Sequence, residues 1–295
     1  MNGWLGWVRW SESKIEVKTR PADPFFVALY LNYLYFIRNN KGSVTSAFYG
    51  IRWAHHMVGL TSPTDNKLVE LAYEGCIRLC GGKKKRRDTI PVQILRNFYD
   101  RFFTECPNMI ELRFLVVCLA GFAGFFRIKE LLLVQLKHLS FKEEHLEIFL
   151  PFSKVDQQRD GDTVYMAKTG TKYCPVNLII QFLSKASLKI NVDVNAYLIP
   201  RLHKTKKGHN ASKTNGISYT TIYENFKELS AMENKENKNW GLHSLRASGA
   251  SVAAQQGISN RLISKQGRWS SETARNGYIQ DSVESRLQVS RSLGV

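Results

Sequence analysis

Acidic residues, long apolar runs and closely spaced cysteines are all scarce in this sequence of 295 residues. Its 25 aspartates and glutamates face 42 lysines and arginines, which gives a net charge of +17. Such a charge on a globular chain implies a polyanionic partner, either nucleic acid or an acidic membrane surface. The longest apolar run, 114–126, is enclosed by Arg113 and Arg127 and is too short to span a bilayer. We therefore expect a buried helix there, no membrane association, and nucleic acid as the partner.

The cysteines are five, an odd number, and they are widely scattered. Cys76 and Cys80 lie one helical turn apart, but no second pair or nearby histidine completes a zinc site. We expect reduced core thiols in an intracellular protein, and no bound metal. The first ten residues lack a basic segment followed by an apolar one, so we expect no secretory signal. They fit the cut end of a longer chain.

The first part of the chain predicts a small helical domain at 20–82. Apolar spacing indicates three short helices over 25–37, 43–58 and 65–79, with Ser43 as the cap of the second. A linker at 83–91 follows, and it opens with five consecutive cations: Lys83, Lys84, Lys85, Arg86 and Arg87. Two interpretations of this run stay open, a solvated linker and a segment that lies along a phosphate backbone.

The remainder, 92–295, predicts a second domain that combines helices with a small sheet. Helices are expected at 92–103, 110–126, 177–187, 219–232, 243–256, 259–266 and 282–292, and one opened by Ser271 should carry Tyr278. Strands are expected at 135–141, 145–152 and 163–167, with a turn at Asp160–Gly161. The predicted fold class is therefore α+β and mostly helical.

An acid-free stretch in this second domain has the composition of a flexible basic loop. Its cations are Arg201, Lys204, Lys206, Lys207 and Lys213. A solvated surface loop and a contact with a DNA backbone fit this composition equally well.

Several single residues carry weak local signals. Arg127 follows thirteen apolar residues, so its guanidinium needs either a structural carboxylate such as Glu130 or a ligand anion. His243 and Arg246 are three residues apart and share a face if they are helical. Taken alone, Lys154 in its polar hairpin is ordinary surface, and Tyr278 is an ordinary half-buried aromatic.

Order and spacing join these signals into one pattern. Trp269 lies 23 residues after Arg246, and Tyr278 lies nine residues after Trp269. The matching segments are Gly-Phe-Phe-Arg-Ile-Lys-Glu-Leu at 124–131, Gly-Leu-His-Ser-Leu-Arg at 241–246, Gly-Arg-Trp at 267–269 and Gly-Tyr-Ile at 277–279. Over about 90–290 the sequence thus resembles the tyrosine recombinase (phage integrase) family. The Ser-Lys-Val-Asp-Gln run at 153–157 resembles the hairpin of eukaryotic mobile-element members.

The resemblance implies both a fold and a mechanism. The fold would be a helical (SAM-like) core-binding domain, here short of its first helix, followed by an integrase-like catalytic domain with a three-stranded antiparallel sheet. Tyr278 would attack the scissile phosphate and form a covalent 3′-phosphotyrosine without metal, ATP or any cofactor. Arg127 and Arg246 would hold the phosphate oxygens. Lys154 would protonate the leaving oxygen, with His243 assisting proton transfer or binding the phosphate.

The resemblance also extends to supporting residues and to partners. Trp269 stands where many members have histidine and can donate one hydrogen bond to phosphate, while Glu130 would orient Arg127 or a neighbour. Double-stranded DNA would be contacted by a group of basic side chains: Lys83, Lys84, Lys85, Arg86, Arg87, Lys204, Lys206 and Lys207. The last helix would pass to a neighbouring protomer in a dimer or tetramer, or pack within its own chain.

The sequence therefore predicts a site-specific DNA strand-exchange enzyme that is encoded by or derived from a mobile element. The alternative is a DNA-binding protein on the same fold that no longer cuts. A third possibility, an RNA-binding protein with accidental motifs, lacks the aromatic-rich strands that RNA-binding sheets use. The hairpin and the basic run together suggest a nuclear location.

Overall fold

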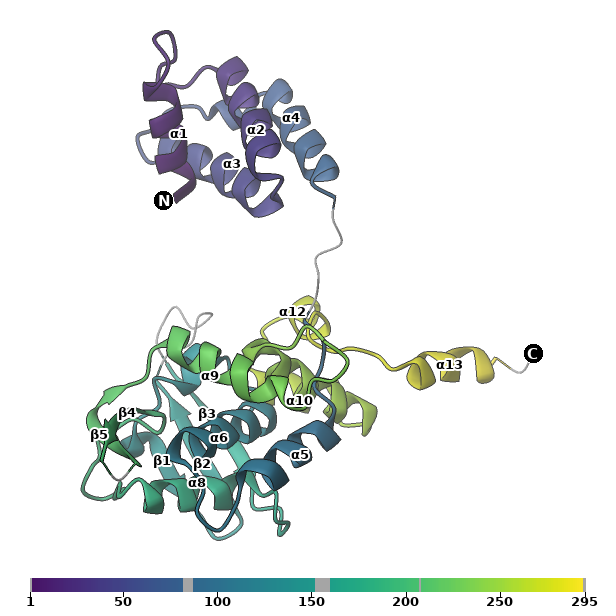
Figure 1. Cartoon of the computed structure of the whole chain (residues 1–295). Helices are drawn as coiled ribbons and strands as arrows, with labels where there is room; N and C mark the ends of the chain where they lie inside the picture. Colours follow the sequence, from purple (N-terminus) through teal and green to yellow (C-terminus); the bar gives the residue numbers. More distant parts are fainter. Residues whose placement is uncertain (1, 82–86, 152–159, 207, 294–295) are drawn as a thin grey trace. The chain divides into compact units, whose positions relative to one another are not determined.

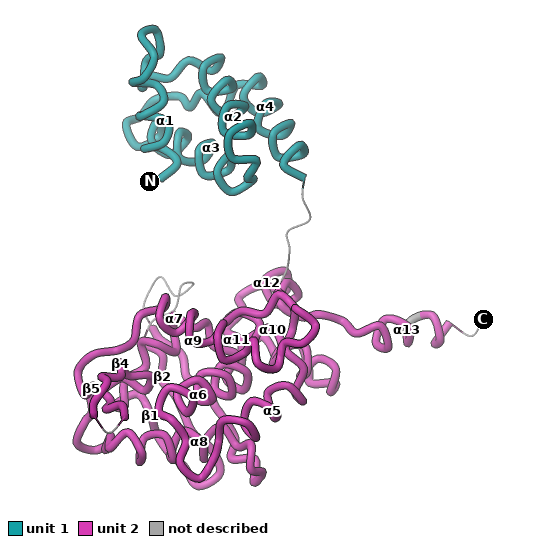
Figure 2. The backbone as a smooth tube through the Cα atoms, viewed as in Figure 1, with its two compact units in different colours: residues 1–85 teal, residues 86–295 magenta. Residues whose placement is uncertain are grey.

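Two compact units, residues 1–85 and 86–295, make up the chain (Figure 2). The computed structural model describes residues 2–81, 87–151, 160–206 and 208–293. The predicted hairpin at 153–157 and most of the basic run, Lys83 to Arg86, lie outside the described residues.

Unit 1 is a bundle of helices whose core includes the fully buried Trp7, Leu31 and Ile51. Its elements are α1 (Asn2–Glu12), α2 (Pro24–Arg38), α3 (Lys41–His56), a 3₁₀ turn (Pro63–Asp65) and α4 (Lys67–Leu79) (Figure 1). The predicted N-cap of α3 is wrong. Asn40, not Ser43, caps α3, because its Oδ1 accepts the amide hydrogen of Gly42 at 2.7 Å and that of Ser43 at 3.3 Å.

Helix α1 was not predicted, and the expectation of only three helices in a domain starting at residue 20 is corrected. The glycines at 3 and 6 lower helix propensity, so the pattern is weak when read from sequence. In the fold, Gly3 and Gly50 let α1 approach α3, and Gly6 leaves room for the Tyr30 hydroxyl of α2. A Cβ on Gly3 would lie 1.8 Å from the carbonyl oxygen of Ser46, and one on Gly50 would lie 2.6 Å from the amide of Trp4. The close packing of α1 on α3 therefore stabilises a helix whose intrinsic propensity is weak.

Unit 2 is built around helix α6 (Met109–Ala123), the apolar run singled out in the sequence. Every residue from Leu112 to Gly121 is buried, Arg113 included. None of the described helices is long and apolar enough to cross a membrane. The helices near α6 are α5 (Val92–Phe102), α8 (Pro175–Lys185), α9 (Tyr219–Ala231) and α10 (Leu242–Gln255) (Figure 1). The shorter ones are α7 (Ile128–Leu131), α11 (Asn260–Gly267), α12 (Glu272–Asn276) and α13 (Val283–Arg291).

A three-stranded antiparallel sheet packs beside these helices, as predicted. Its strands are β1 (Leu139–Phe141), β2 (His145–Leu150) and β3 (Asp162–Ala167), in the order β1-β2-β3. Ile148 of β2 pairs with Leu139 on one side and Val164 on the other, and all three face the core. The first strand is shorter than predicted because 136–138 forms a 3₁₀ turn.

The basic stretch after residue 200 forms an antiparallel ribbon, so the predicted flexible loop is wrong. Strands β4 (Pro200–Thr205) and β5 (Gly208–Gly216) pair with Lys204 opposite His209. Few apolar residues alternate here, so the sequence carries no strand signal. Leu202 and Ala211 pack against the core and hold the ribbon to the domain. Arg201, Lys204, Lys206 and Lys213 are exposed, and Lys207 lies outside the described residues.

All five cysteines are free thiols, but only four lie in a core. Cys76, Cys80, Cys118 and Cys174 are buried, whereas Cys106 is exposed in the connection between α5 and α6. The expectation of core thiols is therefore wrong for Cys106, which follows the end of α5 in a polar segment.

The close crossing of α6 and α10 positions the candidate site. A Cβ on Gly249 of α10 would lie 2.2 Å from the carbonyl oxygen of Phe122, a backbone atom. On the other helix, a Cβ on Gly121 would meet only the side chain of Leu245, at 3.2 Å. Glycine at 249 therefore lets α10 reach the end of α6, which brings Arg246 beside the segment that follows it.

Alanine at residue 249 should destabilise unit 2 by about 2–3 kcal/mol, because the crossing would have to open against a backbone atom. Alanine at 121 is the matched control, and it should cost less than about 1 kcal/mol since the Leu245 side chain can move. Urea unfolding, together with hydrogen exchange of the backbone amides of α6 and α10, measures the stability of both variants. Equal stability of the two variants would contradict this account of the crossing.

Candidate active site

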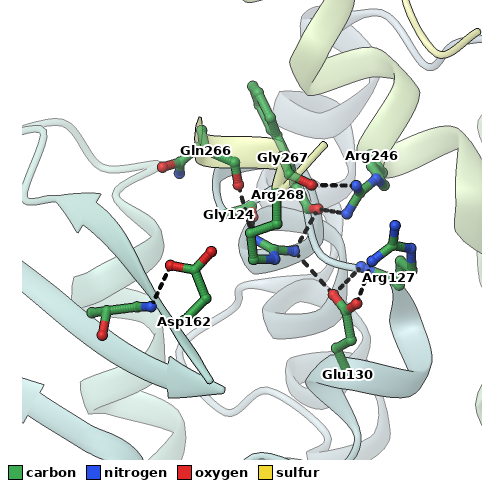
Figure 3. Close-up of polar contacts among 10 residues, drawn as sticks. Gly124, Arg127, Glu130, Asp162, Arg246, Gln266, Gly267 and Arg268 are labelled. Atoms are coloured by element: carbon green, nitrogen blue, oxygen red, sulfur yellow. Dashed lines mark hydrogen bonds and ion pairs between the residues drawn. The ribbon is translucent and has the colours of Figure 1, made fainter. Parts of the chain in front are cut away.

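The candidate site lies where three segments of unit 2 meet: the chain after α6, the first turns of α10, and the residues that follow α11 (Figure 3). Two of these segments turn through left-handed backbone conformations at residues other than glycine. Phe125 has φ 47° and Arg268 has φ 54°. Such conformations are costly for L-residues and are found where surrounding contacts enforce them.

Arg246 is fully buried at the centre of this region. Its guanidinium donates hydrogen bonds to the carbonyl oxygens of Phe125 and Gly267, while its Nε has no partner among the described residues. Burial, followed by the charges of Arg127 and Arg268, lowers the pKa of Arg246 to about 9. At neutral pH the group is still a cation, yet none of the described carboxylates is hydrogen-bonded to it. A bound anion would supply the missing charge.

Two aromatic rings cover this guanidinium. Its central carbon lies 4.5 Å from the ring centroid of Trp269 and 5.0 Å from that of Tyr278, and the two rings are 5.2 Å apart. Trp269 is buried and its Nε1 donor has no partner among the described residues. Tyr278 is half-buried. The site thus has a free indole donor and a phenol beside a buried cation.

The prediction that a helix carries Tyr278 is wrong. Helix α12 ends at Asn276, Gly277 caps it, and Tyr278 follows with its amide donating to the carbonyl of Arg275 at 2.9 Å. The serine cap was read correctly, since Ser271 Oγ accepts the amide hydrogen of Ala274 at 3.2 Å. The helix is shorter than the pattern suggested because glycine ends it one turn early.

Glu130 lies between two arginines (Figure 3). Its Oε1 is 2.6 Å from Nη1 of Arg127, and its Oε2 is 3.0 Å from Nη2 of Arg268. Burial alone would raise the pKa of this carboxyl, but the charges of Arg268 and Arg127 outweigh it and hold the pKa below its ordinary value. Of the two partners left open for Arg127, the structure therefore shows the structural carboxylate.

The charges in this cluster do not cancel. Three guanidinium groups, those of Arg127, Arg246 and Arg268, lie around the carboxylate of Glu130, and the charge of Asp162 also acts on Arg268. Guanidinium groups in such an arrangement bind phosphate through paired hydrogen bonds. The excess positive charge favours the binding of an anion.

His243 is on the first turn of α10, beside the arginines. It is exposed overall, but partial burial of the ring, followed by the charges of Arg246 and Arg127, lowers its pKa below the ordinary histidine value. The imidazole is therefore neutral at physiological pH and can accept a proton.

The structure thus brings together Arg127, Glu130, His243, Arg246, Trp269 and Tyr278. Lys154 and the basic residues Lys83, Lys84, Lys85, Arg86 and Lys207 lie outside the described residues. Arg87 is exposed and donates to Asn239 Oδ1 and, at 3.4 Å, to the carbonyl of Trp240. Lys204 and Lys206 are exposed on the ribbon. Among the described residues, no group of three or more His, Cys, Asp or Glu side chains could hold a metal ion.

One member of the cluster, Arg268, was missed as a functional candidate. It stands inside the Gly-Arg-Trp segment at 267–269 that carries part of the family resemblance. An arginine between polar segments is usually exposed, so the sequence alone does not indicate its burial. Its side chain is only 3% exposed and bonds to Glu130. The signal available in the sequence was its position between two matched residues, Gly267 and Trp269.

Replacing Glu130 with glutamine should destabilise unit 2 by about 3 kcal/mol at neutral pH, because it leaves Arg268 buried without a counter-charge. The pKa of Glu130 is lower in the folded chain than its unfolded value of about 4.3, so its contribution is complete above that value and is lost as the pH falls below it. Urea unfolding at a series of pH values should therefore show that the difference in free energy of unfolding between wild type and Glu130→Gln becomes smaller as the pH falls.

Glu272→Gln is the matched control for this measurement. Glu272 also pairs with a buried arginine, Arg275, at 3.7 Å, but its own side chain is 83% exposed. Its loss should change stability little at any pH. If the free energy of unfolding of Glu130→Gln differs from that of wild type by the same amount down to acid pH, the carboxylate charge is not what stabilises the cluster.

Comparison with known proteins gives one sequence relative and many structural ones. No family model matches the chain. An integrase/recombinase XerD homolog from Selenomonas ruminantium is 26% identical over 265 residues, which cover 88% of this chain and 74% of that protein.

Three of the similar solved structures show how far the fold extends. XerH recombinase bound to its difH substrate in a post-cleavage complex has a TM-score of 0.65 at 12% identity, covering 100% of this chain and 79% of XerH. A lambda integrase dimer bound to a COC′ core site scores 0.60 at 12% identity, covering 95% and 70%. The Tn1549 transposon integrase with circular intermediate DNA scores 0.56 at 11% identity, covering 97% and 98%.

The sequence match extends over most of the chain, and the structural matches extend over both of its units. The chain is therefore similar in sequence to a XerD-like integrase/recombinase, and it has the fold of the tyrosine recombinases XerH and lambda integrase.

Proposed function

We propose that the chain is a site-specific DNA recombinase that cuts and rejoins strands through a covalent 3′-phosphotyrosine. The observation that carries this proposal is the packing of Tyr278 against Arg246, a buried cation whose Nε has no partner, and which bonds to no carboxylate, among the described residues. A phosphodiester placed there would meet a nucleophile and a counter-charge together. Similarity to a XerD homolog and to the fold of DNA-bound recombinases supports the same reading.

The proposed first step forms one bond and breaks another at the same phosphorus. The phenolic oxygen of Tyr278 attacks, its proton passes to the neutral His243 or to water, and the bond from phosphorus to the 5′ oxygen breaks. Lys154 supplies a proton to that leaving oxygen, a role that rests on the sequence pattern. Because the phosphotyrosine keeps the bond energy, a second 5′ hydroxyl can reverse the step without ATP.

Binding of the phosphate is assigned to the arginines and the indole. Arg127 and Arg246 would each donate to non-bridging oxygens, where charge grows in the pentavalent transition state. The unpartnered Nε1 of Trp269 would add one neutral donor. This division leaves proton transfer to His243 and Lys154.

Contacts away from the reacting phosphate are assigned to exposed cations. Lys204 and Lys206 project from the β4–β5 ribbon, which supports a contact with the DNA backbone, and Lys207 and the run 83–87 would extend it. Such contacts position the protein and weaken steeply with salt, without reading the base sequence. We also propose, from the basic run and the hairpin pattern, a mobile-element origin and a nuclear location.

Assembly is assigned to α13. None of its described side chains is buried, and Val283 and Leu287 are 69% and 41% exposed. The helix extends away from the rest of unit 2 (Figure 1). An apolar hollow of about 390 Å³, lined by Ala253, Ile258 and Leu262 among others, lies on the same unit and could receive such a helix from a neighbour. Related folds have been solved as a DNA-bound dimer and as a tetramer on a Holliday junction.

A suicide-substrate trap tests the chemistry. Wild type, Tyr278→Phe and Tyr165→Phe are incubated in EDTA with nicked DNA duplexes. The duplexes carry the end sequences of the mobile element proposed to encode the chain, and the products are run on a denaturing gel. Wild type and Tyr165→Phe should give a slow covalent protein–DNA band, and Tyr278→Phe should give none because it has no nucleophilic oxygen. Tyr165 is the control because its side chain is 54% exposed on β3.

DNA binding without a covalent band on any end sequence would overturn the enzyme proposal in favour of a DNA-binding protein that no longer cuts. Preference for single-stranded RNA over duplex DNA in a salt titration would count against both.

Replacing Leu287 with serine tests the role of α13. Cooperative assembly on a DNA substrate with two sites should weaken, while folding and single-site binding stay unchanged, because the lost apolar surface contacts only a neighbour. Gln288→Ser, an exposed polar position on the same helix, is the control. Native gels and analytical ultracentrifugation give the stoichiometry. A loss of thermal stability in the free Leu287→Ser chain would show instead that α13 packs within its own protomer.

A further inference from the structure

We propose that Arg268 is a positioning residue that keeps the phosphate-facing donors of Arg127 free and fixes the frame in which Arg246 is held. The proposal rests on the function proposed above and adds a residue to it. Arg268 itself would touch neither DNA nor the reacting atoms.

The side chain of Arg268 ties three segments together. Its Nη1 donates to the carbonyl oxygen of Gly124 at 3.3 Å and to that of Gln266 at 2.8 Å. Its Nη2 donates to the carbonyl of Phe125 at 3.1 Å and to Oε2 of Glu130 at 3.0 Å. The guanidinium also lies 5.4 Å from the ring centroid of Phe126. Only the planar fork of arginine can reach all four oxygens at once.

The contact with Glu130 controls Arg127. A free carboxylate three residues from an arginine would pair with it through both oxygens, which uses two of the guanidinium donors. Here Arg268 takes Oε2, so the Arg127 side chain meets only Oε1, through Nη1. The other side-chain donors of Arg127, Nε and Nη2, have no protein partner among the described residues. The second oxygen, Oε2, accepts hydrogen bonds from Arg268 and from the backbone amide of Arg127 at 3.3 Å, so the Arg127 side chain keeps donors for a ligand (Figure 3).

The contact with Phe125 controls Arg246. One carbonyl oxygen, that of Phe125, accepts hydrogen bonds from both Arg246 and Arg268. The second acceptor for Arg246 is the carbonyl of Gly267, whose neighbour in the chain is Arg268 itself. Both oxygens that hold Arg246 are therefore fixed by residue 268, one through its side chain and one through its backbone.

The backbone at residue 268 shows that the side chain is needed there. Its φ of 54° and ψ of 47° are left-handed, a conformation that glycine or asparagine adopts at lower cost than arginine. The strain is retained together with a side chain that makes four hydrogen bonds and is 3% exposed. A residue chosen only to end α11 would not require this side chain.

The test separates rate from binding and from folding. Wild type, Arg268→Lys, Glu130→Gln and the double variant are compared in the trap at saturating nicked DNA, with the Kd for DNA and the thermal midpoint measured alongside. Lysine keeps the charge beside Glu130 but cannot reach the three carbonyls. Arg268→Lys should slow adduct formation by about 10- to 100-fold, the effect of misplaced binding groups, with the Kd unchanged.

Two further comparisons distinguish positioning from general damage. The double variant should be no slower than the slower single variant, because both changes break one connected unit. Arg113→Lys is the matched control: Arg113 is also buried and bonds to the carbonyl of Pro200 and to Asn225, outside this cluster. It should keep the wild-type rate even if its thermal midpoint falls.

A wild-type rate for Arg268→Lys, a rate for the double variant equal to the product of the single effects, or an equal slowing in Arg113→Lys would each overturn the inference. In all three cases wild type still forms the adduct, so the proposed function stands. Absence of an adduct from wild type would overturn the proposed function and the inference with it.

Discussion

A buried arginine that bonds to none of the described carboxylates is the constraint on which unit 2 depends. Arg246 cannot shed its proton at neutral pH, so the fold must satisfy it with oxygens that carry only partial charge. Those oxygens belong to the chain ends of α6 and α11, and they are within reach only because Gly249 lets α10 cross close to α6. The helix crossing and the left-handed turns at Phe125 and Arg268 are part of the arrangement that holds this cation in place.

The sequence predicts a site here because the proposed chemistry rests on residue types at fixed spacings. Arg127, His243, Arg246, Trp269 and Tyr278 lie close together in the structure, and their catalytic roles stay predictions. Most helix bounds were predicted to within a few residues, since long apolar patterns such as that of α6 have only one reading. The three-stranded sheet was predicted for the same reason.

What the sequence did not reveal depends on contacts between distant segments. Helix α1 is rich in glycine and forms because it packs on α3, and the β4–β5 ribbon has too few apolar residues to show alternation. Arg268 was not predicted as a member of the site, because its partners lie up to 144 positions away in the chain. Neither local propensity nor periodicity contains such information.

Of the acceptors that surround the two buried arginines, all but Oε2 of Glu130 have one property in common. Arg246 and Arg268 bond to the carbonyl oxygens of Gly124, Phe125, Gln266 and Gly267, all of them main-chain atoms. Mutation of a side chain cannot delete a main-chain acceptor. It can only move one, by changing the path of the chain. Substitutions at these four positions therefore leave the hydrogen bonds of Arg246 and Arg268 in place. They become harmful only where they change the conformation of the backbone.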